Sequence, residues 1–465
     1  MYKKIEKCHL DELRQIVGAA DLLVSREDRE PYSHDEVVGL GSYPEAVVKP
    51  TTAEQIARIV RLACREKIPV TPRGAGTGLS GGAVPLAGGI VLSLEKMNRI
   101  LEIDSRNLMA VVEPGVITGD LHRAVEAEGL FYPPDPASLD SCSIGGNIAE
   151  NSGGPRAVKY GVTADYVCGL EAVLPTGEIV TSGGKLVKNV TGYNLVQLLV
   201  GSEGTLAVVT RIILRLLPLP KARIDLLIPF GSIETAAATV SEIIRNRLVP
   251  TTIEFMERDS IEACEALLEK ELPFSHAAAH LLIQLDGNDS DQVEADAQKV
   301  GAICMKNGAA DLLVAQDRPT RDRLWSARRQ LLDAVRNLSP VIHMEDIVVP
   351  RSEIPALLSG VKKISEKHSV RIISYGHAGD GNVHVNVLKE SLDDEAWLAL
   401  VPLVDEEIYA LALALGGMIS GEHGIGATRK EHLAAALCQP QIDVMRKVRA
   451  AFDPEGILNP GKIFP

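Results

Sequence analysis

The spacing of apolar residues alternates along the chain between a helical and a strand-like period. Residues 53–66, AEQIARIVRLACRE, repeat apolar side chains every three or four positions and predict a helix. The following IPVTP, at 68–72, predicts a short strand that enters a glycine-rich loop. The runs at 89–97 and 108–116 predict two more strands, and TGDLHRAVEAEG, at 118–129, predicts another helix. This succession indicates an α+β unit with many short strands.

The alternation of helical and strand-like spacing continues further along the chain. EAVLPTGEIV, at 171–180, predicts a hairpin with a Thr-Gly turn, and TLAVVTRIILRLLP, at 205–218, predicts a long strand. The prolines at its end, Pro218 and Pro220, mark a domain boundary because proline interrupts both helices and sheets.

Beyond this boundary the pattern changes. Helical runs such as ETAAATVSEIIRN alternate with strand-like runs such as HLLIQLDG and RIISYG. We therefore expect a first domain over 1–220, a second domain over 221–415, and a C-terminal segment over 416–465 that returns to the first domain.

Size and charge narrow the classes of function. A chain of 465 residues exceeds one ordinary hydrophobic core and can enclose a large cofactor. The formal net charge is −14 and the isoelectric point is near 5.4, which argues against nucleic-acid binding, since phosphate neutralisation needs clustered lysine and arginine.

The distribution of charges and cysteines also bears on location. The N-terminal MYKKIEKCHLDELRQIV carries charges throughout, and no run approaches the roughly 18 uncharged residues of a spanning helix. We expect a cytoplasmic protein, which could associate peripherally with the inner membrane through a partner. The seven cysteines are scattered and form no C-x-x-C motif, so neither a disulfide framework nor an iron–sulfur cluster is expected.

Three small-residue loops are candidate cofactor contacts. RGAGTGLSGGAVP, at 73–85, can expose several backbone N–H groups to a pyrophosphate. It matches neither a Walker loop nor a dinucleotide fingerprint, and taken alone it is explained equally well as a tight connection. The segment at 133–161 is also rich in glycine and serine, and VGSEGTLAVVT, at 200–210, is the third loop. Together they favour a long, bent ligand.

These loops, in this order, resemble those of the vanillyl-alcohol oxidase and p-cresol methylhydroxylase superfamily of flavoproteins. The resemblance implies a two-part FAD-binding domain of the p-cresol methylhydroxylase type and an α+β cap domain with an antiparallel sheet that binds the substrate. Histidine is absent between His34 and His122, so we expect FAD to be held without a covalent bond. By resemblance, the residues that contact FAD are Arg73, Gly74, Gly76, Thr77, Gly78, Ser80, Pro134, Ser143, Gly146, Asn147 and Gly204.

Three histidines and a glutamate stand in two glycine-rich turns near the end of the chain. His377 and His384 lie in SYGHAGDGNVHVN, where a hairpin would bring both imidazoles to one side, and Glu422 and His423 lie in SGEHGIG. Two imidazoles and a carboxylate can bind a catalytic divalent metal with open positions for substrate. Each residue alone could be an ordinary turn or strand residue, but glycine on nearly every side favours a site.

These two motifs resemble those of FAD-linked D-2-hydroxyacid dehydrogenases, including D-lactate dehydrogenases, glycolate oxidase D subunits and D-2-hydroxyglutarate dehydrogenases. The resemblance implies that His377, His384 and Glu422 hold a divalent metal, for which zinc, manganese and iron are all suitable. It also implies that His423 takes the proton of the substrate hydroxyl while the hydride of C2 passes to flavin N5.

The same resemblance points to the residues that recognise the substrate. The family's Trp-x-x-Arg pattern corresponds to Trp325 and Arg328, and Arg328 would clamp the substrate carboxylate. Dicarboxylate-specific relatives have a lysine just before an aspartate in a downstream strand, and here the stretch is VIHMEDIVVP, with Met344 near that place, so a short acid such as D-lactate or glycolate is favoured over 2-hydroxyglutarate. His343 is either a further pocket residue or a buried structural histidine.

Two other functions are compatible with the sequence. The chain could be a non-catalytic FAD-binding subunit of a larger redox complex, although such subunits are expected to lack the complete histidine and glutamate set. It could also be an alkyl-dihydroxyacetone-phosphate synthase, a non-redox relative. For a dehydrogenase, electrons would leave FAD to an electron-transfer flavoprotein, an iron–sulfur subunit or the quinone pathway, and a homo-oligomer is compatible with the sequence.

Overall fold

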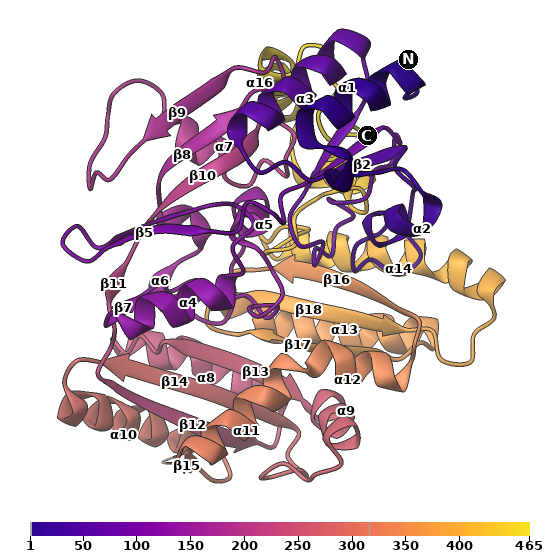
Figure 1. Cartoon of the computed structure of the whole chain (residues 1–465). Helices are drawn as coiled ribbons and strands as arrows, with labels where there is room; N and C mark the ends of the chain where they lie inside the picture. Colours follow the sequence, from indigo (N-terminus) through magenta and orange to yellow (C-terminus); the bar gives the residue numbers. More distant parts are fainter. Residues whose placement is uncertain (1, 316) are drawn as a thin grey trace. The chain divides into compact units, whose positions relative to one another are not determined.

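A computed structural model of the chain, which describes residues 2–315 and 317–465, consists of two compact units (Figure 1). The first comprises Met1–Gly153, Val162–Leu219 and His423–Pro465, and the second comprises Gly154–Gly161 and Pro220–Glu422. The chain thus leaves the first unit beside the predicted proline boundary. It returns between Glu422 and His423, seven residues after the predicted position 416.

The first unit contains a mixed four-stranded sheet in the order β1-β2-β4-β3. Strand β4 pairs in parallel with both β2 and β3. Helices α1 and α3 bury their apolar faces in the same core, and Thr52 caps α3 by accepting from the N–H of Gln55. The bounds are β1 (Leu22–Leu23), β2 (Ala46–Val48), β3 (Val70–Arg73), β4 (Ile90–Ser93), α1 (Lys7–Val17), α2 (Arg26–Arg29) and α3 (Ala53–Glu66).

A second sheet of this unit is antiparallel and has the order β5-β6-β10-β8-β9. The predicted Thr-Gly hairpin joins β8 to β9, and the predicted long strand is β10 at its centre. The bounds are β5 (Ile100–Asp104), β6 (Met109–Val112), β8 (Val167–Val173), β9 (Ile179–Gly183) and β10 (Val208–Arg215), and a small ladder pairs β7 (Leu130–Phe131) with β11 (Leu217–Pro218). The other helices are α4 (Thr118–Ala127), α5 (Ile144–Glu150), α7 (Leu195–Leu199), α15 (Leu433–Ala436) and α16 (Gln439–Phe452).

The second unit is built on one antiparallel sheet in the order β15-β12-β14-β13-β17-β18-β16. Its strands are β12 (Ala222–Phe230), β13 (Thr252–Glu257), β14 (Ala279–Gly287), β15 (Leu313–Ala315), β16 (Ile342–Val348), β17 (Ile372–His377) and β18 (Asn382–Leu388). Its helices are α6 (Ala157–Tyr160), α8 (Ile233–Arg245), α9 (Arg258–Leu268), α10 (Ser290–Lys306), α11 (Arg318–Arg329), α12 (Leu331–Leu338), α13 (Ile354–His368) and α14 (Asp394–Ala414).

Alternation along the strands of this sheet creates two apolar faces. Residues of α8, α10, α13 and α14 share a core with one face, and residues of α9, α11 and α12 share a core with the other (Figure 1). We call the second of these the α11 face. Among residues 2–315 and 317–465, no helix combines the length and apolar composition needed to cross a bilayer.

Candidate functional site

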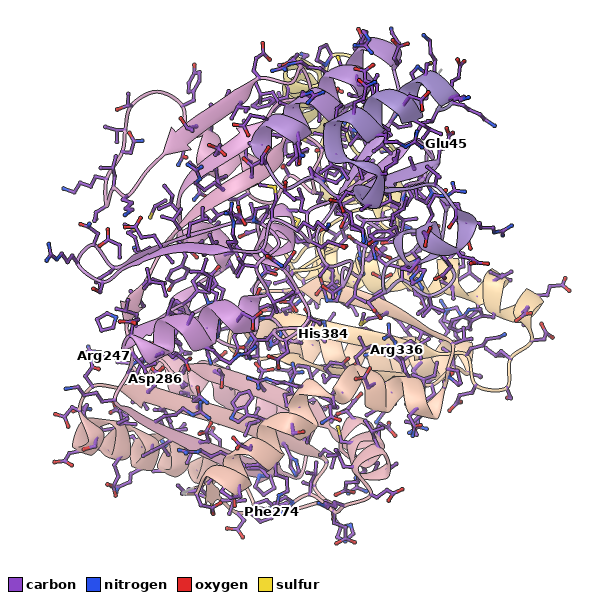
Figure 2. All side chains as sticks on the ribbon, viewed as in Figure 1. Glu45, Arg247, Phe274, Asp286, Arg336 and His384 are labelled. Atoms are coloured by element: carbon purple, nitrogen blue, oxygen red, sulfur yellow. The ribbon has the colours of Figure 1, made fainter. Side chains whose placement is uncertain are left out.

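His377 and His384 lie on adjacent strands of the second unit and face each other. His377 ends β17, and His384 lies on β18 opposite Tyr375 (Figure 2 labels His384). Their ring centroids are 5.3 Å apart, and both side chains are buried. Ile373 and Tyr375 of β17 belong to the core of the α11 face, so alternation places His377 on that face too. The hairpin geometry expected from the sequence is therefore present.

Glu422 closes the group formed by these two histidines. Its Oε1 atom lies 3.4 Å from Nε2 of His377 and 3.5 Å from Nε2 of His384. One carboxylate oxygen thus stands opposite two imidazole nitrogens from different strands. This convergence of donor atoms from residues 38 to 45 positions apart is what a metal site requires.

Asp346 of β16 holds the segment that carries Glu422. Its Oδ2 atom accepts hydrogen bonds of 2.9 Å from the Ser420 hydroxyl and from the N–H groups of Gly421 and Glu422. Its Oδ1 atom lies 3.7 Å from Nδ1 of His384, the residue directly opposite in the strand register. Ligand atoms of Asp346, His384 and Glu422 lie within 4.8 Å of one another. The sequence reasoning missed this aspartate.

A second carboxylate that sequence reasoning missed lies behind His377. Glu254 of β13 is fully buried and directly opposite His377 in the register, and both of its oxygens lie 2.9 Å from Nδ1 of the imidazole. The signal in the sequence was an acidic residue flanked by Ile253 and Phe255 within the strand-like run TTIEFME. This contact leaves Nε2 of His377 as the nitrogen that faces Glu422.

The charges at this site favour a cation. Burial lowers the pKa of His377, but the Glu254 and Glu422 carboxylates outweigh burial and raise that pKa well above its ordinary value. With Asp346, three carboxylates lie around two imidazoles, and Arg328 together with a protonated His377 balances only two of the three negative charges. The donor set of two imidazoles and one or two carboxylates fits zinc, manganese or iron.

Arg328 and Trp325 come from α11 and belong to this face of the sheet. Nη2 of Arg328 lies 2.5 Å from Glu254, and its guanidinium lies 5.3 Å from the Tyr375 ring centre. Its Nε has no hydrogen-bond partner among the described residues. The Trp325 indole N–H donates to Asp225 at 2.7 Å, so this side chain is fixed within the core. The predicted arginine is therefore brought to the histidine group.

His343 is not brought to the histidine group. Strand alternation puts His343 and Glu345 on the face opposite Asp346, and Nε2 of His343 lies 2.9 Å from both Glu345 and Asp405. Burial lowers the pKa of His343, and hydrogen bonds to Asp405 and Glu345 outweigh it, so that the pKa rises to about 10. These contacts are those of a partly exposed, charged histidine that is held by two carboxylates.

In the first unit, the predicted FAD loops meet each other. A Cβ atom on Gly74 would lie 2.4 Å from the Ser143 hydroxyl oxygen, and one on Gly76 would lie 2.1 Å from the Arg73 guanidinium. Gly76 also has a φ of +78°, so only glycine fits there without strain. Arg73 donates to the carbonyls of Pro31 and His34 and so braces the loop.

The remaining predicted FAD contacts lie in the same two loops, except Gly204, which lies in the third loop. Ser143 caps α5 by accepting from the N–H of Gly146, and Asn147 donates to Thr118 at 2.7 Å. The buried Ser80 hydroxyl has no hydrogen-bond partner among the described residues, as expected for a group that serves a ligand. The other predicted contacts of the first unit are Thr77, Gly78, Pro134 and Gly204. The glycine-rich loop at 73–85 has few side chains, and the Ser80 hydroxyl has no partner among the described residues. Both features fit a phosphate-bearing cofactor.

The C-terminal tail makes hydrogen bonds to both the first loop (73–85) and the third loop (200–210). The Lys462 ammonium donates to the carbonyls of Gly81 and Val84, and the Asn459 amide donates to those of Gly82 and Glu203. The tail therefore fixes two of the three cofactor loops. His423 is the first residue of this returning segment and is bonded directly to Glu422, so the peptide bond alone holds their Cα atoms about 3.8 Å apart.

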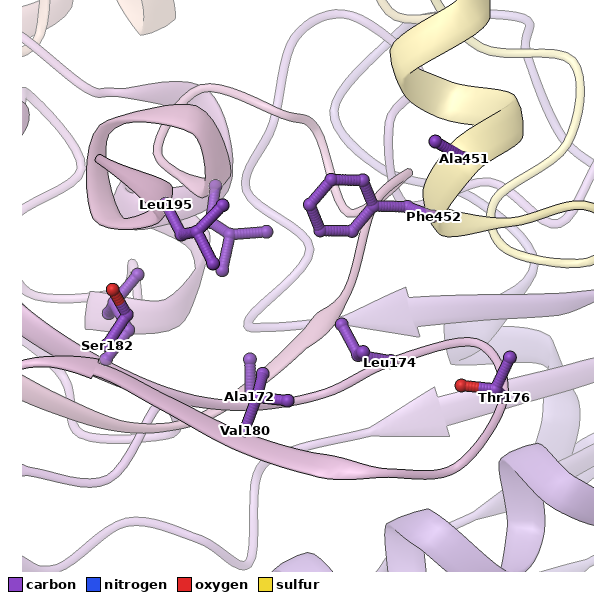
Figure 3. Close-up of a pocket in the computed structure, with 10 residues that line it drawn as sticks. Ala172, Leu174, Thr176, Val180, Ser182, Leu195, Ala451 and Phe452 are labelled. Atoms are coloured by element: carbon purple, nitrogen blue, oxygen red, sulfur yellow. The ribbon is translucent and has the colours of Figure 1, made fainter. Parts of the chain in front are cut away.

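An apolar cavity of about 280 Å³ lies elsewhere in the first unit, beside the β8–β9 hairpin, α7 and the end of α16 (Figure 3). None of the described residues that line it is ionisable, so this lining offers no groups for acid chemistry. Its lining residues are Leu170, Ala172, Leu174, Thr176, Val180, Ser182, Leu195, Leu199, Ala451 and Phe452.

Comparisons with known proteins agree with these observations. Residues 44–183 match the family of FAD binding domains, and residues 219–463 match the C-terminal domain of FAD linked oxidases. The chain is 44% identical over 454 residues to the glycolate oxidase subunit GlcD of Bacillus subtilis (strain 168), covering 98% of this chain and 96% of that protein. It is 40% identical over 468 residues to a D-lactate dehydrogenase of Anaerostipes hadrus, covering 99% and 98%.

The fold agrees as well. A crystal structure of p-cresol methylhydroxylase with bound substrate superimposes with a TM-score of 0.82 at 18% identity, covering 100% of this chain and 98% of that one. The predicted mixed helix and sheet architecture and the flavoprotein resemblance are thereby confirmed. The chain belongs to the FAD-linked oxidases whose members include glycolate oxidase subunits and D-lactate dehydrogenases, and it is an FAD-binding oxidoreductase.

Proposed function

We propose that the protein oxidises a short D-2-hydroxyacid, such as D-lactate or glycolate, to the 2-oxoacid with FAD and a divalent metal. The observation that carries this proposal is the convergence of His377 and His384 on one oxygen of Glu422, at 3.4 and 3.5 Å. Relatives named glycolate oxidase subunit and D-lactate dehydrogenase cover nearly the whole chain and support the substrate class.

Substrate binding would use two groups of the second unit. Arg328 can pair with the substrate carboxylate through its planar guanidinium, whose Nε has no partner among the described residues. His377, His384 and Glu422 would hold the metal. A divalent cation bound there lowers the pKa of a coordinated substrate hydroxyl.

Proton removal would fall to His423. Imidazole changes charge close to neutral pH and is suited to accept a hydroxyl proton. Its peptide bond to Glu422 keeps the proposed base one residue from a proposed metal ligand along the chain. FAD, when bound, supplies the acceptor for the hydride of C2.

The side chain of Met344 bears on the size of the substrate acid. This residue lies on β16 opposite Asn386, two positions before Asp346, on the α11 face. An apolar thioether there offers no positive charge to a second carboxylate. This favours a short acid over 2-hydroxyglutarate, and the reduced FAD would pass its electrons to a partner acceptor.

Anaerobic mixing with a panel of D- and L-2-hydroxyacids tests the proposal, with metal content measured on the same sample. We expect bleaching of the flavin by D-lactate or glycolate, weaker bleaching by D-2-hydroxyglutarate, and one divalent metal per chain. Flavin that stays oxidised with every acid would support the alternative of a non-catalytic FAD-binding subunit. Fastest bleaching by D-2-hydroxyglutarate would overturn the argument from Met344.

A further inference from the structure

Glu254 is the point at which the proposed metal ligands and the proposed substrate clamp meet. It contacts Nδ1 of His377 at 2.9 Å and Nη2 of Arg328 at 2.5 Å, from a strand on which neither of these residues lies. We propose that Glu254 is a positioning residue that couples metal binding to recognition of the substrate carboxylate. This inference rests on the function proposed above and names the residue that joins its two halves.

Glu254 decides which nitrogen of His377 is available to a metal. Since both oxygens of Glu254 lie 2.9 Å from Nδ1, that nitrogen carries the hydrogen and donates it to the carboxylate. Nε2 faces Glu422, 3.4 Å away, and is therefore the nitrogen that is left for a metal. Glu254 therefore selects the tautomer that can bind a metal and increases the basicity of Nε2.

The negative charge of Glu254 requires partners. The side chain is fully buried, and a buried carboxylate is stable only when paired. Its two partners are a donor of the proposed metal site and a guanidinium, so neither can move without affecting the other. The ring of Tyr375 lies against both Arg328 and His384 and limits their movement, with centroid distances of 5.3 and 5.4 Å.

Arg328 is the second partner of Glu254. One nitrogen of Arg328 is committed to Glu254, while Nε has no partner among the described residues. Glu254 thus orients the guanidinium and leaves donor capacity for the substrate. Removal of the Glu254 charge is expected to weaken metal binding and raise KM together, whereas an independent defect at either group would change only one of them.

The experiment compares Glu254→Gln with Glu257→Gln in the purified, FAD-containing chain. Glu257 lies on the same strand and accepts from the N–H of Ser374, which is neither a proposed metal ligand nor part of the substrate clamp, so it is the matched control. Binding of Mn²⁺ is measured from the loss of the free-ion EPR signal, which needs no turnover. We expect Mn²⁺ affinity to fall on the order of 10- to 100-fold in Glu254→Gln, with a parallel rise in KM for D-lactate, and to stay unchanged in Glu257→Gln.

The outcomes separate this inference from the proposed function. If the native chain binds no Mn²⁺, the result refutes both the proposed metal site and this inference. If the native chain binds Mn²⁺ and Glu254→Gln binds it equally well, only this inference falls, and a change in KM without a change in affinity overturns it too. Glu254→Asp, which keeps the charge on a shorter side chain, is expected to restore part of both quantities and serves if the glutamine variant does not fold.

Discussion

The carboxylate of Glu203 accepts a 2.7 Å hydrogen bond from the backbone N–H of Gly426, which lies 223 residues further along the chain. The adjacent N–H of Ile425 donates to the other oxygen of the same carboxylate at 2.9 Å. Glu203 belongs to the third cofactor loop, and Gly426 lies in the turn that begins at His423. One side chain of the FAD-binding unit therefore fixes the backbone that carries the proposed base.

Replacing Glu203 with glutamine should disturb this turn. The amide would present a donor to one of two N–H groups, so one buried hydrogen bond would be lost, at a cost of about 1 to 3 kcal/mol. We expect a lower free energy of unfolding in urea and slower anaerobic reduction of the flavin by D-lactate. The exposed Glu126→Gln should change neither quantity. Reduction at the native rate would show that Glu203 does not position the turn.

Replacing His423 with alanine should leave a yellow protein that no longer bleaches. The substitution removes the base without removing any predicted FAD contact, so the absorption spectrum and FAD content should be native. General bases contribute on the order of 10²- to 10⁴-fold, and the single-turnover rate of flavin reduction should fall by that amount. His432→Ala, nine residues away, is the control and should bleach normally. A native rate for His423→Ala would refute its role as the base.

His384→Ala should lose the metal. The substitution removes one of two imidazoles that converge on Glu422, and elemental analysis after dialysis should find well under one divalent ion per chain. His280 offers a demanding control, because it is fully buried in β14 of the same sheet and contacts the carbonyl of Phe274. His280→Gln should keep its metal. Stoichiometric metal in His384→Ala would refute the ligand assignment.

Local pattern was enough to predict helices and strands next to the three candidate cofactor loops. The helix over 53–66 has the predicted bounds because a strong apolar stripe follows a capping threonine. The His377 and His384 pair was predictable because one hairpin turn joins their strands, so their proximity follows from local chain geometry. Their role as ligands remains a proposal.

The orienting carboxylates were not predictable in the same way. Glu254 and His377 are 123 residues apart and meet only because β13 pairs with β17 in one register. Asp346 likewise becomes visible only when β16 pairs with β18. A single acidic residue among apolar neighbours in a strand indicates a buried charge, but it does not indicate which residue will be the partner of that charge. Strand alternation could have separated His343 from Asp346, since an odd spacing puts them on opposite faces.

Arg328→Lys should raise KM while the protein remains folded. Lysine keeps the positive charge but loses the planar fork, so a carboxylate can no longer be held by two parallel hydrogen bonds. The loss of one charge-assisted hydrogen bond corresponds to about a tenfold to hundredfold increase in KM for D-lactate. Arg329→Lys is the matched control, since Arg329 is the exposed neighbour on the same helix. Equal KM values for the two variants would exclude Arg328 as the clamp.

Glu257→Gln should change how stability depends on pH. Burial raises the pKa of Glu257 to about 7 from an ordinary value of 4.5, although the Ser374 N–H opposes this shift. The folded protein therefore prefers the neutral acid, and this contribution to stability is full below about pH 4.5 and is lost as the pH rises to about 7. Glutamine is neutral throughout, so the free energy of unfolding of the variant should rise relative to that of the native protein across that window, by about 3 kcal/mol at pH 8. Urea unfolding at several pH values measures this difference, for which the exposed Glu178→Gln is the control. A difference that does not vary between pH 4.5 and 7 would mean that Glu257 titrates normally in the folded protein.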